Sequence, residues 1–327
     1  MRRLQTRIPG SVTKDRLDLF LSEWLPHAVG KPVSKTQIRL LIQSGAVYVN
    51  RHRNRIATSP VFTGAMIEVY YDEERMNQKT STGETRMAET RFDSNRIVFE
   101  DDYLIIVDKP TGLPTQPTVD PNRANLFELM KKFFAERDER ENPYVGLHHR
   151  LDKDTSGLVL FTKKEEANKG VATLFAKHMI QKTYHCLCWR GPGSRKLVAN
   201  EEFTIENHLG RVSEQAGKTK YGEVTSGGDR AITEFRAIEV FRDIYWLQAR
   251  PKTGRTHQIR VHCSEDKLPI LGDSMYFPEK ISAFVVSPRL MLHAGELKFI
   301  HPITQQEIIA SSPLPQEFVQ LLGQLKA

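Results

Sequence analysis

The chain of 327 residues contains only three cysteines, Cys186, Cys188 and Cys263. So few cysteines cannot build a disulfide framework, and they are typical of proteins in a reducing cytoplasm. Long apolar runs are also missing: segments such as Leu104–Val107 have the length of a strand, far below the roughly 20 residues of a membrane-spanning helix. No apolar stretch follows the basic residues of the first ten positions, so we expect no secretory signal there. We therefore expect a cytoplasmic protein.

Several enzyme signatures are absent from the sequence. There is no glycine-rich phosphate loop ending in Gly-Lys-Ser/Thr, and Gly191–Gly193 lacks the rest of a dinucleotide-binding fingerprint. Neither the His-Glu-x-x-His pattern of zinc peptidases nor the Gly-x-Ser-x-Gly turn of serine hydrolases occurs. Cys186 and Cys188 share one face of an expected strand, which is half a zinc site at best. We interpret them as small apolar core residues and expect no metal.

Positive charge is concentrated in the first part of the chain. Residues 1–72 hold 11 lysines and arginines against five acids, a net charge of +6. The remaining 255 residues hold 36 against 35 and carry +1. A basic module on a nearly neutral body favours an anionic polymer as partner, whereas a solubilising basic surface explains the charge equally well.

Residues 14–71 are expected to form a compact unit of two helices and short strands. Apolar residues at helical spacing predict a helix from residue 17 that closes at Pro26. Ser34 is a suitable N-cap for a second helix that runs through Gln43. Short strands are expected at 47–50 and 66–70.

Residues 72–95 are expected to form a linker, because they are almost entirely polar and charged. In the remaining part, residues 96–327, helices are expected over 126–137 and 165–177. A strand-rich mixture without a βαβ rhythm predicts an α+β fold with a mainly antiparallel sheet. The expected strands are 97–100, 104–108, 183–189, 231–240, 245–249 and 307–310.

The densest polar segment is Leu147–Gly157, which precedes an apolar strand. Carboxylates, potential cations and hydroxyls crowd together here, as they do in catalytic loops held by a rigid scaffold. Asp154-Thr155-Ser156-Gly157 is also ordinary turn chemistry, in which the aspartate caps its own backbone. The residues alone favour the turn, and they leave the catalytic hypothesis open.

A second polar run spans Lys252–His262. The sequence leaves open whether it is a strand, in which alternate residues share a face, or a helix. In both cases Arg260 has apolar neighbours and is expected to be partly buried, so it needs an anionic partner. Asp152 and Asp154 are the candidates.

Together these segments resemble the RluA-type pseudouridine synthase family. The pattern His-Arg-Leu-Asp-x-x-Thr-Ser-Gly is long and specific, and other family segments follow in the same order over about residues 96–315. The matching segments are Val107–Leu113, His149–Gly157, Lys182–Tyr184, Gly254–His262, Leu271–Asp273 and Leu292–Ala294. One departure is Gln116, where many members have histidine before a proline; it bears on substrate choice rather than on catalysis.

Residues 14–71 are similar to the small RNA-binding domain, of the alpha-L motif type, first known from ribosomal small-subunit protein four. The similarity rests on Arg16-Leu17-Asp18 and on the helix Ser34–Gly45 with its exit strand. It implies that this domain binds RNA backbone through its basic side chains. These are Lys35, Arg39, Arg51, Arg53 and Arg55.

The resemblance implies a catalytic domain built on a bisected mixed sheet, mainly antiparallel, next to a small α/β RNA-binding domain. The implied reaction isomerises uridine to pseudouridine within RNA, with large-subunit ribosomal RNA as the expected substrate, no cofactor and a monomeric protein. Asp152 is the implied catalytic carboxylate, which either attacks the sugar or removes a sugar proton. Arg260 would pair with Asp152 and hold it in the ionised form, and Tyr184 would stack on the detached uracil and assist proton removal.

Further residues would bind the substrate, by the same resemblance. Arg150 would fill the gap left by the flipped nucleotide or hold its phosphate. His149 and Thr155 would shape the catalytic loop rather than react. Leu292 and Leu297 would wall the uracil pocket, although core packing is nearly as good an explanation for both.

Three other hypotheses compete with this one. A synthase of the same family could act on transfer RNA instead. A non-catalytic RNA-binding or ribosome assembly factor could keep the fold, but it would not need Asp152, Tyr184 and Arg260 together. An unrelated glycosidase would need a second acid opposite Asp152, and only Asp154 stands in a suitable motif.

Overall fold

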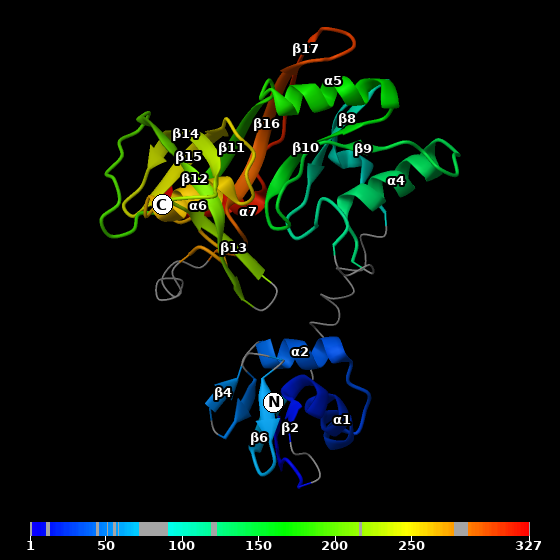
Figure 1. The fold of residues 1–327 in the computed structure, drawn as a ribbon, viewed down its shortest axis with the longest axis vertical. Helices are drawn as coiled ribbons and strands as arrows, with labels where there is room; N and C mark the ends of the chain where they lie inside the picture. The colour runs from blue at the N-terminus through cyan, green and yellow to red at the C-terminus, as the bar shows by residue number, and fades with distance from the viewer. Residues whose placement is uncertain are drawn as a thin grey trace. The chain divides into compact units, whose positions relative to one another are not determined.

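The computed structural model describes residues 2–10, 14–43, 46–50, 52–54, 57, 59–71, 91–118, 123–215, 218–277 and 287–326. The chain divides into two compact units, Met1–Glu89 and Thr90–Ala327. Figure 1 shows the elements of both units in chain order, coloured from blue to red. None of the helices in the described ranges is long and apolar enough to cross a membrane.

The first unit combines two helices with short strands. Its largest sheet has the order β1-β6-β3-β4 and is antiparallel throughout, and β2 pairs with β5. The elements are β1 (Arg2–Arg7), β2 (Lys14–Arg16), α1 (Leu17–Val29), α2 (Lys35–Gln43), β3 (Val47–Val49), β4 (His52–Asn54), β5 (Pro60–Phe62) and β6 (Met66–Tyr71).

This unit begins before residue 14, where the sequence pattern placed its start. Strand β1 pairs with β6 along its whole length, from Arg2 opposite Tyr71 to Arg7 opposite Met66. The sequence pattern did not predict this strand, because half of its residues are arginines, which have no strong preference for strands. Pairing with the apolar strand β6 overrides that preference.

The two helices show how local chemistry sets their ends. Helix α2 is confirmed, with a capping box: Ser34 Oγ accepts the Gln37 N–H at 3.2 Å, and Gln37 Oε1 accepts the Ser34 N–H at 2.8 Å. The expected end of α1 at Pro26 is wrong, because Pro26 lies inside the helix. The helix continues for most of a turn and ends at Gly30, which adopts the left-handed conformation with φ 75°.

The second unit is built on one large mixed sheet. Its strand order is β13-β12-β14-β15-β11-β16-β10-β8-β7, with β17 pairing to β16 and β9 to β10. The elements are η1 (Ser94–Arg96), β7 (Ile97–Glu100), β8 (Leu104–Lys109), α4 (Leu126–Arg137), β9 (Gly146–Leu147), β10 (Ser156–Thr162), α5 (Glu165–Ala176), β11 (Gln181–Trp189), β12 (Glu202–Gln215), β13 (Lys218–Glu223), β14 (Asp229–Val240), β15 (Ile244–Pro251), α6 (Gln258–Glu265), β16 (Leu292–Ile300), β17 (Glu307–Ser311) and α7 (Gln316–Lys326).

The expected α+β fold with a mainly antiparallel sheet is confirmed. Both expected helices, α4 and α5, are present, and so are all the expected strands. Strands β9, β12, β13 and β16 were not anticipated. The polar run around Arg260, left open between strand and helix, is the helix α6.

Helices cover the β8–β10 half of the sheet on both faces (Figure 1). Alternate residues of β10 point to opposite sides: Leu158 and Leu160 pack with α5, whereas Val159 and Phe161 pack with α4. All seven residues of β10 are buried, which explains its nearly continuous apolar sequence.

A narrow parallel contact joins the two halves of the sheet. Strands β10 and β16 pair at only two positions, Ser156 opposite His293 and Gly157 opposite Ala294, and theirs is the one parallel pairing among the described strands. A Cβ atom on Gly157 would lie 2.2 Å from the Ala294 carbonyl oxygen, and its φ is 115°, so only glycine fits. The polar loop with Asp152 precedes β10, whereas Tyr184 and Arg260 belong to the other half.

Candidate active site

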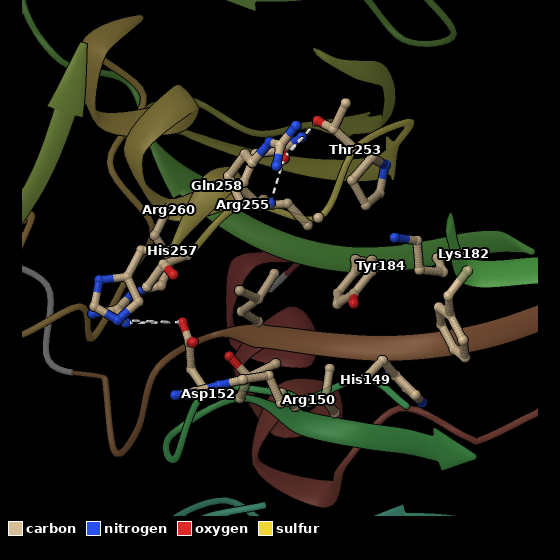
Figure 2. Close-up of a pocket in the computed structure, with 18 of the residues that line it drawn as sticks. His149, Arg150, Asp152, Lys182, Tyr184, Thr253, Arg255, His257, Gln258 and Arg260 are labelled. Atoms are coloured by element: carbon tan, nitrogen blue, oxygen red, sulfur yellow. Dashed lines mark hydrogen bonds and ion pairs between the residues drawn. The ribbon is translucent and has the colours of Figure 1, made fainter. Parts of the chain in front are cut away.

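A pocket of about 410 Å³ opens between the two halves of the sheet. Figure 2 shows Arg150 and Asp152 on one side, with Tyr184, His257 and Arg260 facing them. The structure brings together most of the predicted residues of this domain. These are His149, Arg150, Asp152, Thr155, Tyr184, Arg260 and Leu292.

Asp152 presents one oxygen to Arg260 and His257 and leaves the other open. Arg260 Nη1 donates to Oδ2 at 3.1 Å, and His257 Nε2 lies 3.7 Å from the same oxygen. Oδ1 has no hydrogen-bond partner among the described residues. The side chain is 20% exposed, so the carboxylate is fixed on one edge and accessible on the other. This arrangement suits a group that reacts through a single oxygen.

Arg260 is held more firmly by a carboxylate that the sequence did not suggest. Its Nε and Nη2 donate to Asp273 at 2.7 and 2.9 Å, a bidentate pair in which Asp273 is fully buried. Although burial disfavours the charge, Asp273 and Asp152 together raise the pKa of Arg260. Asp154, the other proposed partner, is wrong: its side chain is half exposed and lies 3.8 Å from Lys153. Arg260 therefore bridges a structural carboxylate and an open one.

Tyr184 faces the pocket from β11 as a neutral phenol. Burial, together with the nearby charge of Asp152, raises its pKa above the ordinary value. The hydroxyl therefore keeps its proton at neutral pH. This favours a stacking role for the ring over the role of a base.

The loop that carries Asp152 is tied down by buried hydrogen bonds. Lys109, fully buried at the end of β8, donates through Nζ to the carbonyl oxygens of Pro110, Leu113 and Lys153 at 2.9 to 3.1 Å. Thr115 Oγ1 donates to the Leu151 carbonyl at 2.8 Å. These bonds lock both neighbours of Asp152 in place.

Replacing Lys109 by methionine is expected to lower the free energy of unfolding by about 2 kcal/mol, since three backbone carbonyls lose the donor that the buried Lys109 supplies. Activity should fall more than stability implies, because the loop with Asp152 loosens. Urea unfolding and rate measurements on the same preparation check this. Lys132→Met, at an exposed position of α4, is the control and should change neither quantity.

His149 and Thr155 make hydrogen bonds within and beside the loop that carries Asp152. His149 Nε2 accepts the Leu160 N–H at 2.9 Å, and its ring stacks on Phe175 at 4.6 Å. Burial lowers the pKa of His149 to about 3, so the ring is neutral. The Thr155 N–H donates to the Asp152 carbonyl at 3.2 Å, which closes the turn.

Two cations of the pocket have no hydrogen bond or ion pair within the described part of the chain. Arg150 is exposed at the rim, and Lys182 is half-buried on β11, where burial lowers its pKa. Both are therefore available to an anionic ligand.

The two leucines predicted to wall the pocket differ. Leu292 lines it, whereas Leu297 packs into the core with Leu104 and Leu158. The pairing of β16 with β11 changes register between Ala294 and Glu296, so the two leucines lie on either side of a bulge. The prediction for Leu297 is therefore wrong.

The three cysteines meet in the core rather than in the pocket. Cys188 Sγ lies 3.7 Å from Cys186 Sγ and 3.9 Å from Cys263 Sγ, and all three are buried free thiols. A structural zinc site takes four ligands, and the described residues offer three here. The thiols belong to the largest apolar cluster, as small core residues do.

The basic residues predicted to bind RNA belong to the first unit. Lys35 and Arg39 lie four positions apart on α2 and are both exposed. Arg53 lies on β4. Arg51 and Arg55 lie outside the described residues.

Sequence reasoning missed several residues of the site. Asp273 stood in a recognised segment but had no assigned role, and Lys109 stood in another. His257 belongs to the polar run around Arg260 and contacts Tyr276, whose position carried no signal at all.

Comparisons with known proteins show which family the chain is similar to. The family model described as RNA pseudouridylate synthase matches residues 103–265. Ribosomal large subunit pseudouridine synthase D of Haemophilus influenzae is 31% identical over 330 residues, covering 95% of this chain and 91% of that protein. Ribosomal large subunit pseudouridine synthase C of Vibrio vulnificus is 29% identical over 317 residues, covering 95% and 93%.

Solved structures share the fold. The structure titled human RNA pseudouridylate synthase domain containing 4 superposes with a TM-score of 0.55 at 20% identity, covering 76% of this chain and 97% of that one. The structure titled human RNA pseudouridylate synthase domain containing 1 gives a TM-score of 0.53 at 22% identity, with 73% and 98% covered.

Proposed function

Because the chain belongs to the RNA pseudouridylate synthase family, we propose that it isomerises specific uridines to pseudouridine in large-subunit ribosomal RNA. The observation that carries the proposal is the open oxygen Oδ1 of Asp152, whose other oxygen, Oδ2, is held by Arg260 in the pocket that Tyr184 also lines. The choice of RNA is supported by relatives named for the large ribosomal subunit that match over nearly their full length.

The reaction needs a carboxylate and a shaped pocket. The bond between the uracil nitrogen and the sugar breaks, the base rotates, and carbon five joins the sugar in its place. Carbon five then loses its proton, and the freed nitrogen gains one, so atoms and charge balance. Asp152 either attacks the sugar or removes the neighbouring sugar proton, and both routes use the single open oxygen.

Neighbouring side chains would position the substrate. Tyr184 offers a flat, neutral ring on which the detached uracil can stack. Arg150, exposed at the rim, suits the gap that a flipped nucleotide leaves or the phosphate beside it. Lys182 adds a second cation inside the pocket.

The N-terminal residues 14–71 would bind RNA backbone, joined by the linker 72–95 to a catalytic domain of residues 96–327. Lys35 and Arg39 present two charges from one face of α2. Phosphate contacts of this kind give affinity and orientation, while loop and stem shape selects the site. The proposed function includes a cytoplasmic location and a monomeric protein.

Mapping pseudouridine in ribosomal and transfer RNA tests the proposal. Cells lacking the protein are compared with cells that regain either the wild type or Asp152→Asn. We expect one or more large-subunit pseudouridines to disappear, and to return with the wild type alone. A site lost only from transfer RNA would move the substrate to that class. Unchanged maps in both RNA classes would favour the non-catalytic RNA-binding hypothesis.

Removing the charges of α2 should weaken RNA binding in a salt-dependent way. We expect Lys35→Gln with Arg39→Gln to make the slope of log affinity against log salt shallower by roughly 1 to 2. With fewer phosphate contacts, fewer counterions are released from the RNA on binding. Filter binding at several salt concentrations measures the slope. Lys131→Gln with Lys132→Gln on α4 is the matched control. Equal slopes for all three proteins would remove α2 from the RNA-binding surface.

A further inference from the structure

The pocket contains a histidine in an uncommon backbone conformation. His257 occupies the N-cap position of α6 with φ 57° and ψ 18°, in the left-handed region that only a few non-glycine residues adopt. This conformation costs of order 1 kcal/mol or more, and such strain collects at functional sites. The side chain lies between Asp152 and Tyr276.

The hydrogen bonds around Tyr276 fix which nitrogen of His257 carries the proton. The Tyr221 backbone N–H donates to the Tyr276 hydroxyl oxygen at 3.1 Å, and His257 Nδ1 lies 2.9 Å from the same oxygen. Burial raises the pKa of Tyr276 to about 12, so the hydroxyl keeps its hydrogen. Among the described residues, Nδ1 is the one acceptor within reach of that hydrogen.

The ring itself is neutral. Burial lowers the pKa of His257, so at neutral pH one nitrogen donates and the other accepts. With Nδ1 accepting from Tyr276, the hydrogen sits on Nε2. That nitrogen lies 3.7 Å from Asp152 Oδ2, the oxygen already bound by Arg260.

We propose that His257, locked by Tyr276 as the Nε2–H tautomer, is a positioning residue that donates to Asp152 Oδ2 when RNA closes the pocket. Hydrogen bonds of catalytic groups are often long in the free enzyme and tighten with substrate bound. Two donors on Oδ2 leave Oδ1 as the reacting oxygen. The relay runs from the Tyr221 backbone through Tyr276 and His257 to Asp152, and it rests on the proposed function.

Two substitutions of His257 test whether its side chain must reach Asp152 or whether only its backbone conformation matters. Asparagine tolerates the left-handed region and keeps an acceptor for Tyr276, but it has no atom that reaches Asp152. Glutamine places an amide N–H near the position of Nε2. We expect His257→Asn to lower kcat about tenfold, the rate equivalent of one charge-assisted hydrogen bond. KM should stay within about twofold of the wild type, and His257→Gln should recover most of kcat.

A double-mutant cycle tests the link to Tyr276. Tyr276→Phe keeps the ring that lies 5.1 Å from the Arg260 guanidinium but removes the hydroxyl. We expect it to lower kcat, and the double variant with His257→Asn to be no slower than His257→Asn alone. Tyr245→Phe is the control, because it removes another buried hydroxyl outside the pocket, and its kcat should be unchanged. The relay would be overturned if the losses in kcat of the two single variants multiply in the double variant. Equal kcat for His257→Asn and His257→Gln would overturn it as well.

Nitrogen NMR of histidine-labelled full-length protein gives a second test without RNA. We expect the His257 signal, assigned by its loss in His257→Asn, to report protonation on Nε2, and to change in Tyr276→Phe. Protonation on Nδ1 would refute the relay whatever the substrate proves to be. A wild-type protein that forms no pseudouridine in the rate assays would count against the proposed function instead.

Discussion

Asp152→Asn should abolish pseudouridine formation while leaving the fold intact. Asparagine has the same shape but cannot act as nucleophile or base, so the rate should fall by about 10³-fold or more. Its side chain can still accept from Arg260 Nη1, and Asp273 keeps Arg260 paired. Single-turnover assays on purified RNA measure the loss, and thermal unfolding checks the fold.

Asp154→Asn is the matched control for this experiment. It removes a carboxylate from the same loop, but one that is half exposed and only loosely paired with Lys153. The rate should stay within about twofold of the wild type, because an exposed ion pair contributes little free energy. Equal loss in the two variants would mean that loop charge matters, rather than the Asp152 carboxylate.

Asp273→Asn should produce the largest loss of stability. It leaves the buried Arg260 without its main counter-charge, and breaking a buried pair costs about 3–5 kcal/mol. Activity should fall as well, because Arg260 would turn away from its geometry toward Asp152. Asp266→Asn is the control: it breaks the bidentate but partly exposed pair with Arg195 and should cost less than about 1 kcal/mol.

The same pair predicts how stability depends on pH. Burial favours the protonated form of Asp273, but the bonds and charge of Arg260, with two backbone N–H groups, outweigh it and lower the pKa of Asp273. A lowered pKa in the folded state adds stability above the ordinary value of 3.8, and this stability is lost as the pH falls through the folded-state value. Urea unfolding between pH 3 and 7 should therefore show a steeper acid decline for wild type than for Asp273→Asn.

Sequence patterns were sufficient where the signal is local. The continuous apolar run of β10, the capping box of α2 and the motif around Asp152 each depend on a few neighbouring residues. Resemblance then supplied the pairing of Arg260 with Asp152, which are 108 positions apart and which no periodicity could connect.

The failures have physical causes of their own. Asp273 is a single acid in an apolar stretch, and only folding shows that it neutralises a buried arginine. The arginine-rich strand β1 and the extension of α1 beyond Pro26 depend on tertiary contacts that override local preference. The prediction that Leu297 walls the pocket was wrong because its side chain packs in the core with Leu104 and Leu158, a tertiary contact that the sequence of β16 alone does not show.

The narrow parallel contact between β10 and β16 also has a consequence for biosynthesis. A ribosome makes the first 89 residues, which form a unit with its own core, well before it reaches Arg260 and His293. Residues from both halves of the sheet line the pocket, so the pocket can form only after nearly the whole chain has been synthesised. Chains interrupted during synthesis before this point would therefore contain the folded first unit without a complete pocket.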